Sequence, residues 1–171
     1  MQLGQRKDAP CLDGEIAGPT PRAMACAAIA VMLIYGLSLS GVWWAGPDSA
    51  LYMGLGRSLA EGHGFSFNGS VSTNVTPGLP LLLAGLRLAF GASCWGPNLV
   101  MALSALACIF AVFRMVACLS DKATALAVAL ATAFSYRFLN HAQRVLTNVP
   151  FCALFWLCLL GSVRSGQKSP W

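Results

Sequence analysis

Two groups of polar residues in this chain have the types and the spacing needed for proton transfer and for binding an anion. Asp48 follows Pro47 directly after a long apolar segment, and a carboxylate in that place can take a proton from a hydroxyl group. The second group consists of Arg137, His141, Arg144 and Asn148. Its intervals of four, three and four residues place the whole group on one face if the helix there is continuous. Cationic side chains gathered in this way predict an anion site.

Each of these residues also has a purely structural interpretation. As the N-cap of a following helix, Asp48 would accept hydrogen bonds from amides of the first turn. The cap is the favoured role, although a capped carboxylate can still serve as a base. Snorkelling to lipid headgroups explains the cationic group equally well. Asn148 ahead of Pro150 fits the start of a helix at least as well as a binding role.

The composition indicates a membrane protein. With 57% hydrophobic residues, 10% charged residues and a mean hydropathy of +0.66, the chain lies outside the usual range of soluble domains. Its net charge of +5 comes from basic residues that stand singly between apolar runs, which argues against a nucleic-acid partner. Most of the seven cysteines lie in apolar runs and no C-x-x-C pair occurs, so neither a disulfide framework nor a metal site is expected.

The apolar segments predict an all-α fold, a polytopic transmembrane helical bundle of about four spans within residues 23–163. A crossing of about 30 Å of hydrocarbon needs about 20 apolar residues. The expected spans are residues 23–45, 99–119, 123–139 and 147–164. Residues 1–22 are expected to be a disordered cytoplasmic tail, and residues 164–171 a second cytoplasmic tail that looks truncated before a further helix.

The first outer loop, residues 46–98, is expected to carry amphipathic juxtamembrane helices. Leu51, Leu55 and Leu59 recur every fourth position, and Arg57 and Glu61 form an i, i+4 pair. The positive-inside rule favours keeping residues 77–91 on the outer surface, because the basic residues outside this loop then gather largely on the cytoplasmic side. The expected location is therefore a bacterial inner membrane, with the amino terminus in the cytoplasm and the polar loops outside.

Three stretches resemble the amino-terminal part of the GT-C membrane glycosyltransferases, the superfamily of protein O-mannosyltransferases and aminoarabinose transferases. They are P-D-S-A-L-Y followed by R-S-L-A-E-G-H-G-F at residues 47–65, T-P-G-L-P-L-L at residues 76–82 and Q-R-V-L-T-N-V-P-F at residues 143–151. The first stretch is fairly specific, whereas the other two are weak alone. Many family members have a second acidic residue where this chain has Ser49, and a carboxylate where it has Asn148.

The resemblance implies transfer of a sugar from a polyprenyl-phosphate donor to an acceptor glycan, lipid or protein on the non-cytoplasmic face. Asp48 would be the catalytic base, and Arg144 with His141 and Arg137 would bind the donor phosphate, with Asn148 at a possible second site. No cofactor is implied with certainty, and the resemblance leaves the need for a divalent metal open. A further chain would supply the missing carboxy-terminal half. The alternative is a small non-enzymatic multi-pass membrane protein, either an assembly subunit or a transporter.

Overall fold

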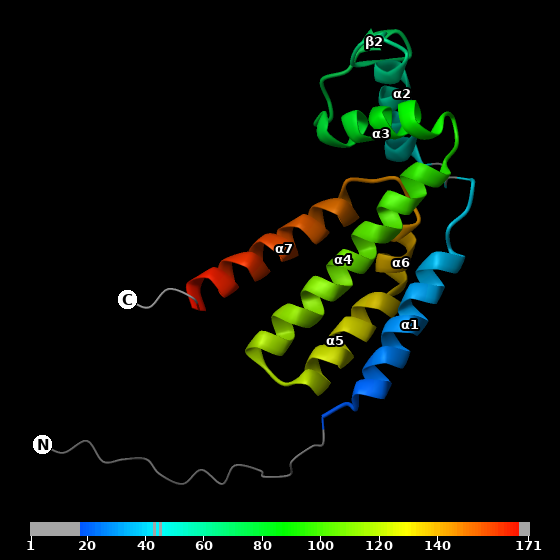
Figure 1. The fold of residues 1–171 in the computed structure, drawn as a ribbon. Helices are drawn as coiled ribbons and strands as arrows, with labels where there is room; N and C mark the ends of the chain where they lie inside the picture. Colours follow the sequence, from blue (N-terminus) through cyan, green and yellow to red (C-terminus); the bar gives the residue numbers. More distant parts are fainter. Residues whose placement is uncertain (1–17, 43, 45, 168–171) are drawn as a thin grey trace, which may run out of the picture.

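The computed structural model describes residues 18–42, 44 and 46–167 of the 171-residue chain. This part is almost entirely helical (Figure 1). Its helices are α1 (Pro21–Leu37), α2 (Pro47–Ala60), α3 (Gly78–Phe90), α4 (Trp95–Leu119), α5 (Lys122–Phe134), α6 (Tyr136–Ala142) and α7 (Asn148–Gln167). A short antiparallel hairpin joins β1 (Ser66–Phe67) to β2 (Ser70–Val71) between α2 and α3.

The prediction of a bundle with about four membrane spans is wrong. Among the described helices, only α4, with 25 residues, is long and apolar enough to cross a membrane. The other apolar helices are shorter. They include α1, α5 and the apolar part of α7, which lie where spans were expected at residues 23–45, 123–139 and 147–164. The helical class itself agrees with the structure.

The first expected span is too short because the chain leaves the helix at Leu37. Beyond that point the Asn98 side-chain amide, from the first turn of α4, donates hydrogen bonds to the backbone carbonyls of Ser40 and Val42 at 2.7 and 3.0 Å. These carbonyls are thereby held away from helical geometry, so the charge-free sequence up to residue 45 does not continue α1. At its other end α1 starts at Pro21, inside the expected tail, with Thr20 as its N-cap. Residues 1–17 lie outside the described residues.

The third expected span is divided at Ser135. Its backbone is extended, with φ −60° and ψ 123°, and its N–H donates to the carbonyl of Thr132. The Thr132 hydroxyl also donates to the carbonyl of Val128 at 2.9 Å. The extended backbone at Ser135 ends α5 and makes α6 a separate helix. The expected tail from residue 164 also differs, because α7 continues to Gln167.

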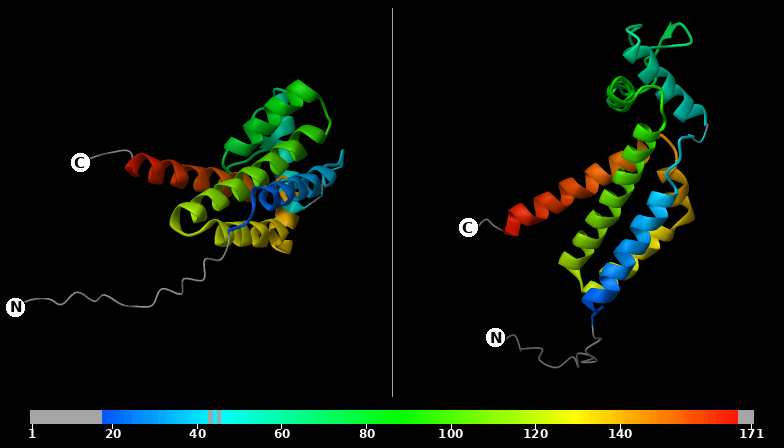
Figure 2. Two further views of the ribbon diagram at one scale, coloured as in Figure 1. Left: turned by 60° about the horizontal axis from the view of Figure 1, so that its bottom comes forward. Right: turned by 45° about the vertical axis from the view of Figure 1, so that its right-hand side comes forward.

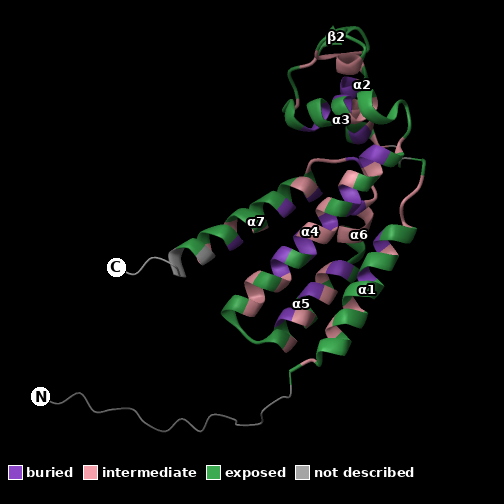
Figure 3. Cartoon of the chain, in the orientation of Figure 1, coloured by how far each residue is buried: buried purple, intermediate pink, exposed green. Residues whose placement is uncertain are grey.

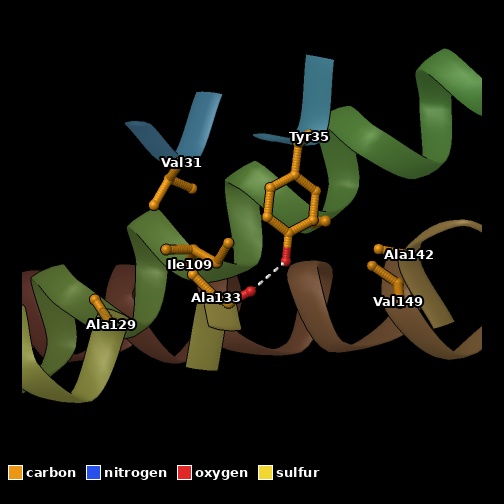
Figure 4. Close-up of a cluster of buried hydrophobic side chains, with 8 residues drawn as sticks. Val31, Tyr35, Ile109, Ala129, Ala133, Ala142 and Val149 are labelled. Carbon is orange, nitrogen blue, oxygen red and sulfur yellow. Dashed lines mark hydrogen bonds between the residues drawn. The ribbon is translucent and has the colours of Figure 1, made fainter. Parts of the chain in front are cut away.

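The described part of the molecule has two parts (Figures 1 and 2). α1, α4, α5, α6 and α7 form a bundle, and α2, the hairpin and α3 form a smaller unit at one end of it, which we call the head (residues 47–90). Inside the bundle a buried cluster joins α1, α4, α5, α6 and α7, and the hydroxyl of Tyr35 donates to the Ala133 carbonyl at 3.0 Å within it (Figure 4).

The head is closely packed and is joined to the bundle by a second buried cluster. A Cβ added at Gly56 of α2 would lie 2.7 Å from Leu83 Cβ of α3, so only glycine permits this crossing. Leu83 and Leu79 of the head then pack with Met101 of α4 and Val145 of the α6–α7 link. The packing of the head against the bundle therefore depends on Val145, which lies far along the chain in the link between α6 and α7.

Candidate functional site

Asp48 is the second residue of α2, at the end of this helix that faces the bundle. Its side chain is exposed. Among the described residues it takes part in no side-chain hydrogen bond or ion pair. The N-cap of α2 is Gly46, so the favoured structural role of Asp48 as the cap is wrong, and its carboxylate is free to meet a ligand.

The side chain of Ser49, rather than that of Asp48, forms the hydrogen bonds at the start of α2. Its hydroxyl accepts a hydrogen bond from the Gly46 N–H at 3.0 Å and lies 3.1 Å from the Gly46 carbonyl, to which it can donate. The Ser49 side chain is 1% exposed, and it is the one buried polar side chain in the described part of the chain. The sequence contains no signal for this role, because the reciprocal capping pattern has Glu or Gln, not serine, at the third helical position.

Arg144 lies beside the same helix start. The residue follows α6, in the link to α7, and is half-buried. Its Nη1 is 3.7 Å from the position that a Cβ on Gly46 would occupy. Its Nε is buried and has no hydrogen-bond partner among the described residues. The guanidinium and the helix N-terminus, which carries a partial positive charge, both favour an anion there. No ion pair within 4.0 Å joins Arg144 to Asp48 in the described part.

Arg144 is held there by its neighbour Val145. This side chain is fully buried in the cluster between the head and α4. Because Val145 must enter that cluster, α6 ends at Ala142 rather than continuing into α7. The predicted single helical face is therefore wrong: Arg137 and His141 lie on α6, whereas Arg144 follows it.

Arg137 and His141 belong to α6, and Asn148 belongs to α7. Arg137 is exposed on α6, and His141, one turn later, is half-buried with Nδ1 buried and unpartnered in the described part of the chain. Both line an open groove of about 560 Å³ with Thr132 and Ser135. Asn148 is exposed and is the first residue of α7, so it belongs to the helix rather than preceding it.

A second polar cluster lies on the head, around Glu61. The Arg57 and Arg87 guanidinium groups approach one Glu61 carboxylate oxygen at 2.9 and 3.1 Å, and His63 Nδ1 is 3.9 Å from the other oxygen. The hydrogen bond from Arg57 has the largest effect on the pKa of Glu61. The positive charge of Arg57 and the hydrogen bond and charge of Arg87 also lower this pKa, which therefore lies below its usual value of 4.5. The sequence predicts the Arg57 pair, but no local pattern connects Glu61 to a residue 26 positions away.

Within residues 18–42, 44 and 46–167, no three His, Cys, Asp or Glu side chains gather in a way that could hold a metal ion. Comparison of the chain with protein-family models, with curated proteins and with solved structures gives no match.

Proposed function

We propose that this chain is the amino-terminal module of a membrane glycosyltransferase that uses a polyprenyl-phosphate sugar on the non-cytoplasmic face. In the proposed reaction an acceptor hydroxyl oxygen bonds to the anomeric carbon of the donor while the bond from that carbon to the phosphate oxygen breaks. The Asp48 carboxylate takes the hydroxyl proton, and Arg144 stabilises the departing lipid phosphate. The resemblance of residues 47–65 to GT-C enzymes supports the choice of reaction.

One observation carries this proposal. Residues nearly a hundred positions apart in the sequence meet at one helix start, where Arg144 Nη1 lies 3.7 Å from the Cβ position of Gly46, two residues before Asp48. A proton acceptor and an anion-binding group on one side of the molecule are what the transfer needs. The Arg144 Nε, which is buried and has no hydrogen-bond partner in the described part of the chain, adds a donor that a phosphate could satisfy.

A membrane location is part of the proposal, with α4 as the crossing helix. The bundle shows large exposed apolar side chains along its outer faces, such as Leu33, Phe110, Leu154 and Phe155 (Figure 3), and patches of this kind mark contact with lipid or protein. Two tryptophans near the head are exposed: Trp95 is the first residue of α4, and Trp44 lies just before α2. Aromatic residues of this type favour the interface between lipid and water.

Binding and turnover test the two residues separately. Purified full-length chain should bind undecaprenyl monophosphate, and Arg144→Gln should weaken this binding about tenfold, because a charge-assisted contact is lost. Asp48→Asn should leave the binding intact. In a membrane assay that contains a lipid-linked sugar and a chain supplying the carboxy-terminal half, Asp48→Asn should reduce transfer by roughly 10²-fold or more, since the proton acceptor is removed.

Two matched variants serve as controls. Arg57→Gln removes an exposed cation from the other part of α2, and Asp121→Asn changes a carboxylate at the far end of the bundle to another good N-cap residue. Both should bind and transfer like the wild type. Equal binding by wild type and Arg144→Gln, or full transfer by Asp48→Asn, would contradict the proposal and favour a non-enzymatic membrane protein.

A further inference from the structure

An apolar groove of about 360 Å³ runs between α1, α4 and α5. Every residue that lines it is apolar, and the three helices contribute Met24, Val31, Phe110, Phe113, Leu126 and Leu130 among others. Its floor is formed by Val31, Ile109 and Ala129, which are buried (Figure 4). Phe110 at its rim is 55% exposed. A surface of this kind needs an apolar occupant.

Small side chains on α1 leave the groove open. Ala27 and Ala28 lie on the face of α1 that lines it, with Met24 one turn before and Val31 one turn after. Alanine cannot reach across to α4, so the space between the two helices stays unfilled. The hollow therefore follows directly from the sequence of α1.

Basic residues stand at the end of the groove that is away from the head. Arg114 lies four residues after Phe110 on α4, and Lys122 lies four residues before Leu126 on α5, so each continues a row of lining residues. Both side chains are exposed and take part in no ion pair in the described part of the chain. Arg22 in the first turn of α1 lies at the same end.

The one carboxylate at this end, among the described residues, is Asp121, and it is already hydrogen-bonded to the start of α5. Asp121 accepts hydrogen bonds from the N–H groups of Ala123 and Thr124 at 2.8 and 2.9 Å and from the Thr124 hydroxyl at 2.6 Å. These bonds cap α5 and lower the pKa of Asp121 to about 2. Among the described residues, Arg22, Arg114 and Lys122 stand beside a single carboxylate at this end of the groove, a balance of charge that suits an anion.

We propose that this groove binds an anionic phospholipid, with an acyl chain between α1, α4 and α5 and the headgroup phosphate at Arg114 and Lys122. Basic positions beside membrane-embedded helices on the cytoplasmic side are typical binding places for acidic headgroups. The inference rests on the membrane location proposed above but not on sugar transfer. The groove has its charged end away from the head, so this lipid is distinct from the donor at Arg144.

Thermal unfolding of the full chain in a mild detergent tests the site. Excess dioleoylphosphatidylglycerol should raise the Tm by roughly 5 °C or more, dioleoylphosphatidylcholine should raise it less, and inorganic phosphate should have no effect. Ala28→Phe, which fills the groove, should abolish the increase. Ala30→Phe is the matched control, because Ala30 is exposed on the same helix but does not line the groove. Arg114→Gln combined with Lys122→Gln should remove the preference for the anionic lipid.

A second measurement covers the case in which Ala28→Phe does not fold. Phe110→Trp places a fluorophore at the rim, and phosphatidylglycerol brominated along its acyl chain should quench this variant more than the wild type. The proposal is overturned if Ala28→Phe keeps the full increase in Tm, if inorganic phosphate reproduces that increase, or if Phe110→Trp shows no additional quenching. Dimers that Ala28→Phe dissociates would overturn it too, by identifying a second copy of the chain as the occupant. Each of these outcomes leaves the binding test at Arg144 unaffected.

Discussion

Capping α2 and presenting a side chain to a ligand are performed by two different residues, Ser49 and Asp48. The Ser49 hydroxyl satisfies the Gly46 N–H at the start of α2, and this leaves the carboxylate of Asp48 without a bond to the backbone. A residue engaged as a cap must give up that contact, or share it, before it can bind a ligand. At this helix the buried serine has the structural role, and the exposed aspartate is left to meet a ligand.

Ser49→Ala should lower the stability of the folded chain by about 1 kcal/mol, because the Gly46 amide loses its partner at a buried position. The measurement is thermal unfolding of the purified chain in detergent. Ser70→Ala is the matched control in the same head, since Ser70 is exposed. An unchanged Tm for Ser49→Ala would mean that Asp48 or water caps α2 instead.

Sequence reasoning can place Asp48 at the start of a helix, but it cannot choose between neighbouring capping residues. Both Asp48 and Ser49 have side chains that accept from a helix amide. The choice depends on which side chain the surrounding structure buries, and that involves residues distant in the sequence. For the same reason the position of Arg144 beside Gly46 has no local signal: it follows from the burial of Val145 under the head.

Among the helices, α2 and α3 are held together by packing and by one shared carboxylate. Glu61 receives hydrogen bonds from Arg57 on its own helix and from Arg87 of α3. The pKa of Glu61 is lowered first by the Arg57 bond. Since the folded state holds the proton less tightly than the unfolded state, the stabilisation is complete above pH 4.5 and is lost as the pH falls through the lower folded value.

Arg87→Gln should therefore reduce the acid sensitivity of the head. Between pH 6 and pH 3 the loss in Tm should be smaller for Arg87→Gln than for the wild type, and smallest for Glu61→Gln, which has no charge to lose. Circular dichroism in buffered detergent at constant ionic strength measures these values. Parallel curves for all three proteins would show that the carboxylate does not link α2 to α3.

Helix boundaries separate what the sequence predicts from what it leaves undetermined. Residues 99–119 are apolar apart from Ser104 and Arg114, and they lie within α4 as the sequence predicts. α1 stops at Leu37 although the following residues are equally free of charge. The deciding contact comes from Asn98, which bonds to the carbonyls of residues 40 and 42. A hydropathy pattern contains no information about that contact.

At the scale of the whole molecule, exposed large hydrophobic residues occur on both the bundle and the head. They lie on α1, α4 and α7 and also on α3 of the head, where Leu88 and Phe90 are exposed. The polar cluster around Glu61 lies on the head. The proposed crossing by α4 puts the head and the α4–α5 turn on opposite sides of the membrane. The basic residues at that turn then agree with a cytoplasmic position.

Epitope tags test this orientation. A tag inserted after Gly69, in the exposed hairpin, should bind antibody on intact spheroplasts, whereas a tag after Ser120 should bind only after the membrane is permeabilised. Both insertions fall in exposed turns between elements, where added residues are tolerated best. Detection of both tags on the same side would exclude a crossing by α4.

The place of Val145 in the cluster under the head also determines the order in which the protein can be completed during synthesis. α2 and α3 leave the ribosome before residue 145, and until that residue follows, their contact surface against Met101 lacks one member. The nascent head must therefore wait, with apolar surface uncovered, while three further helices are made. Arg144 arrives with Val145, so the anion-binding side of the site is the last part to be assembled.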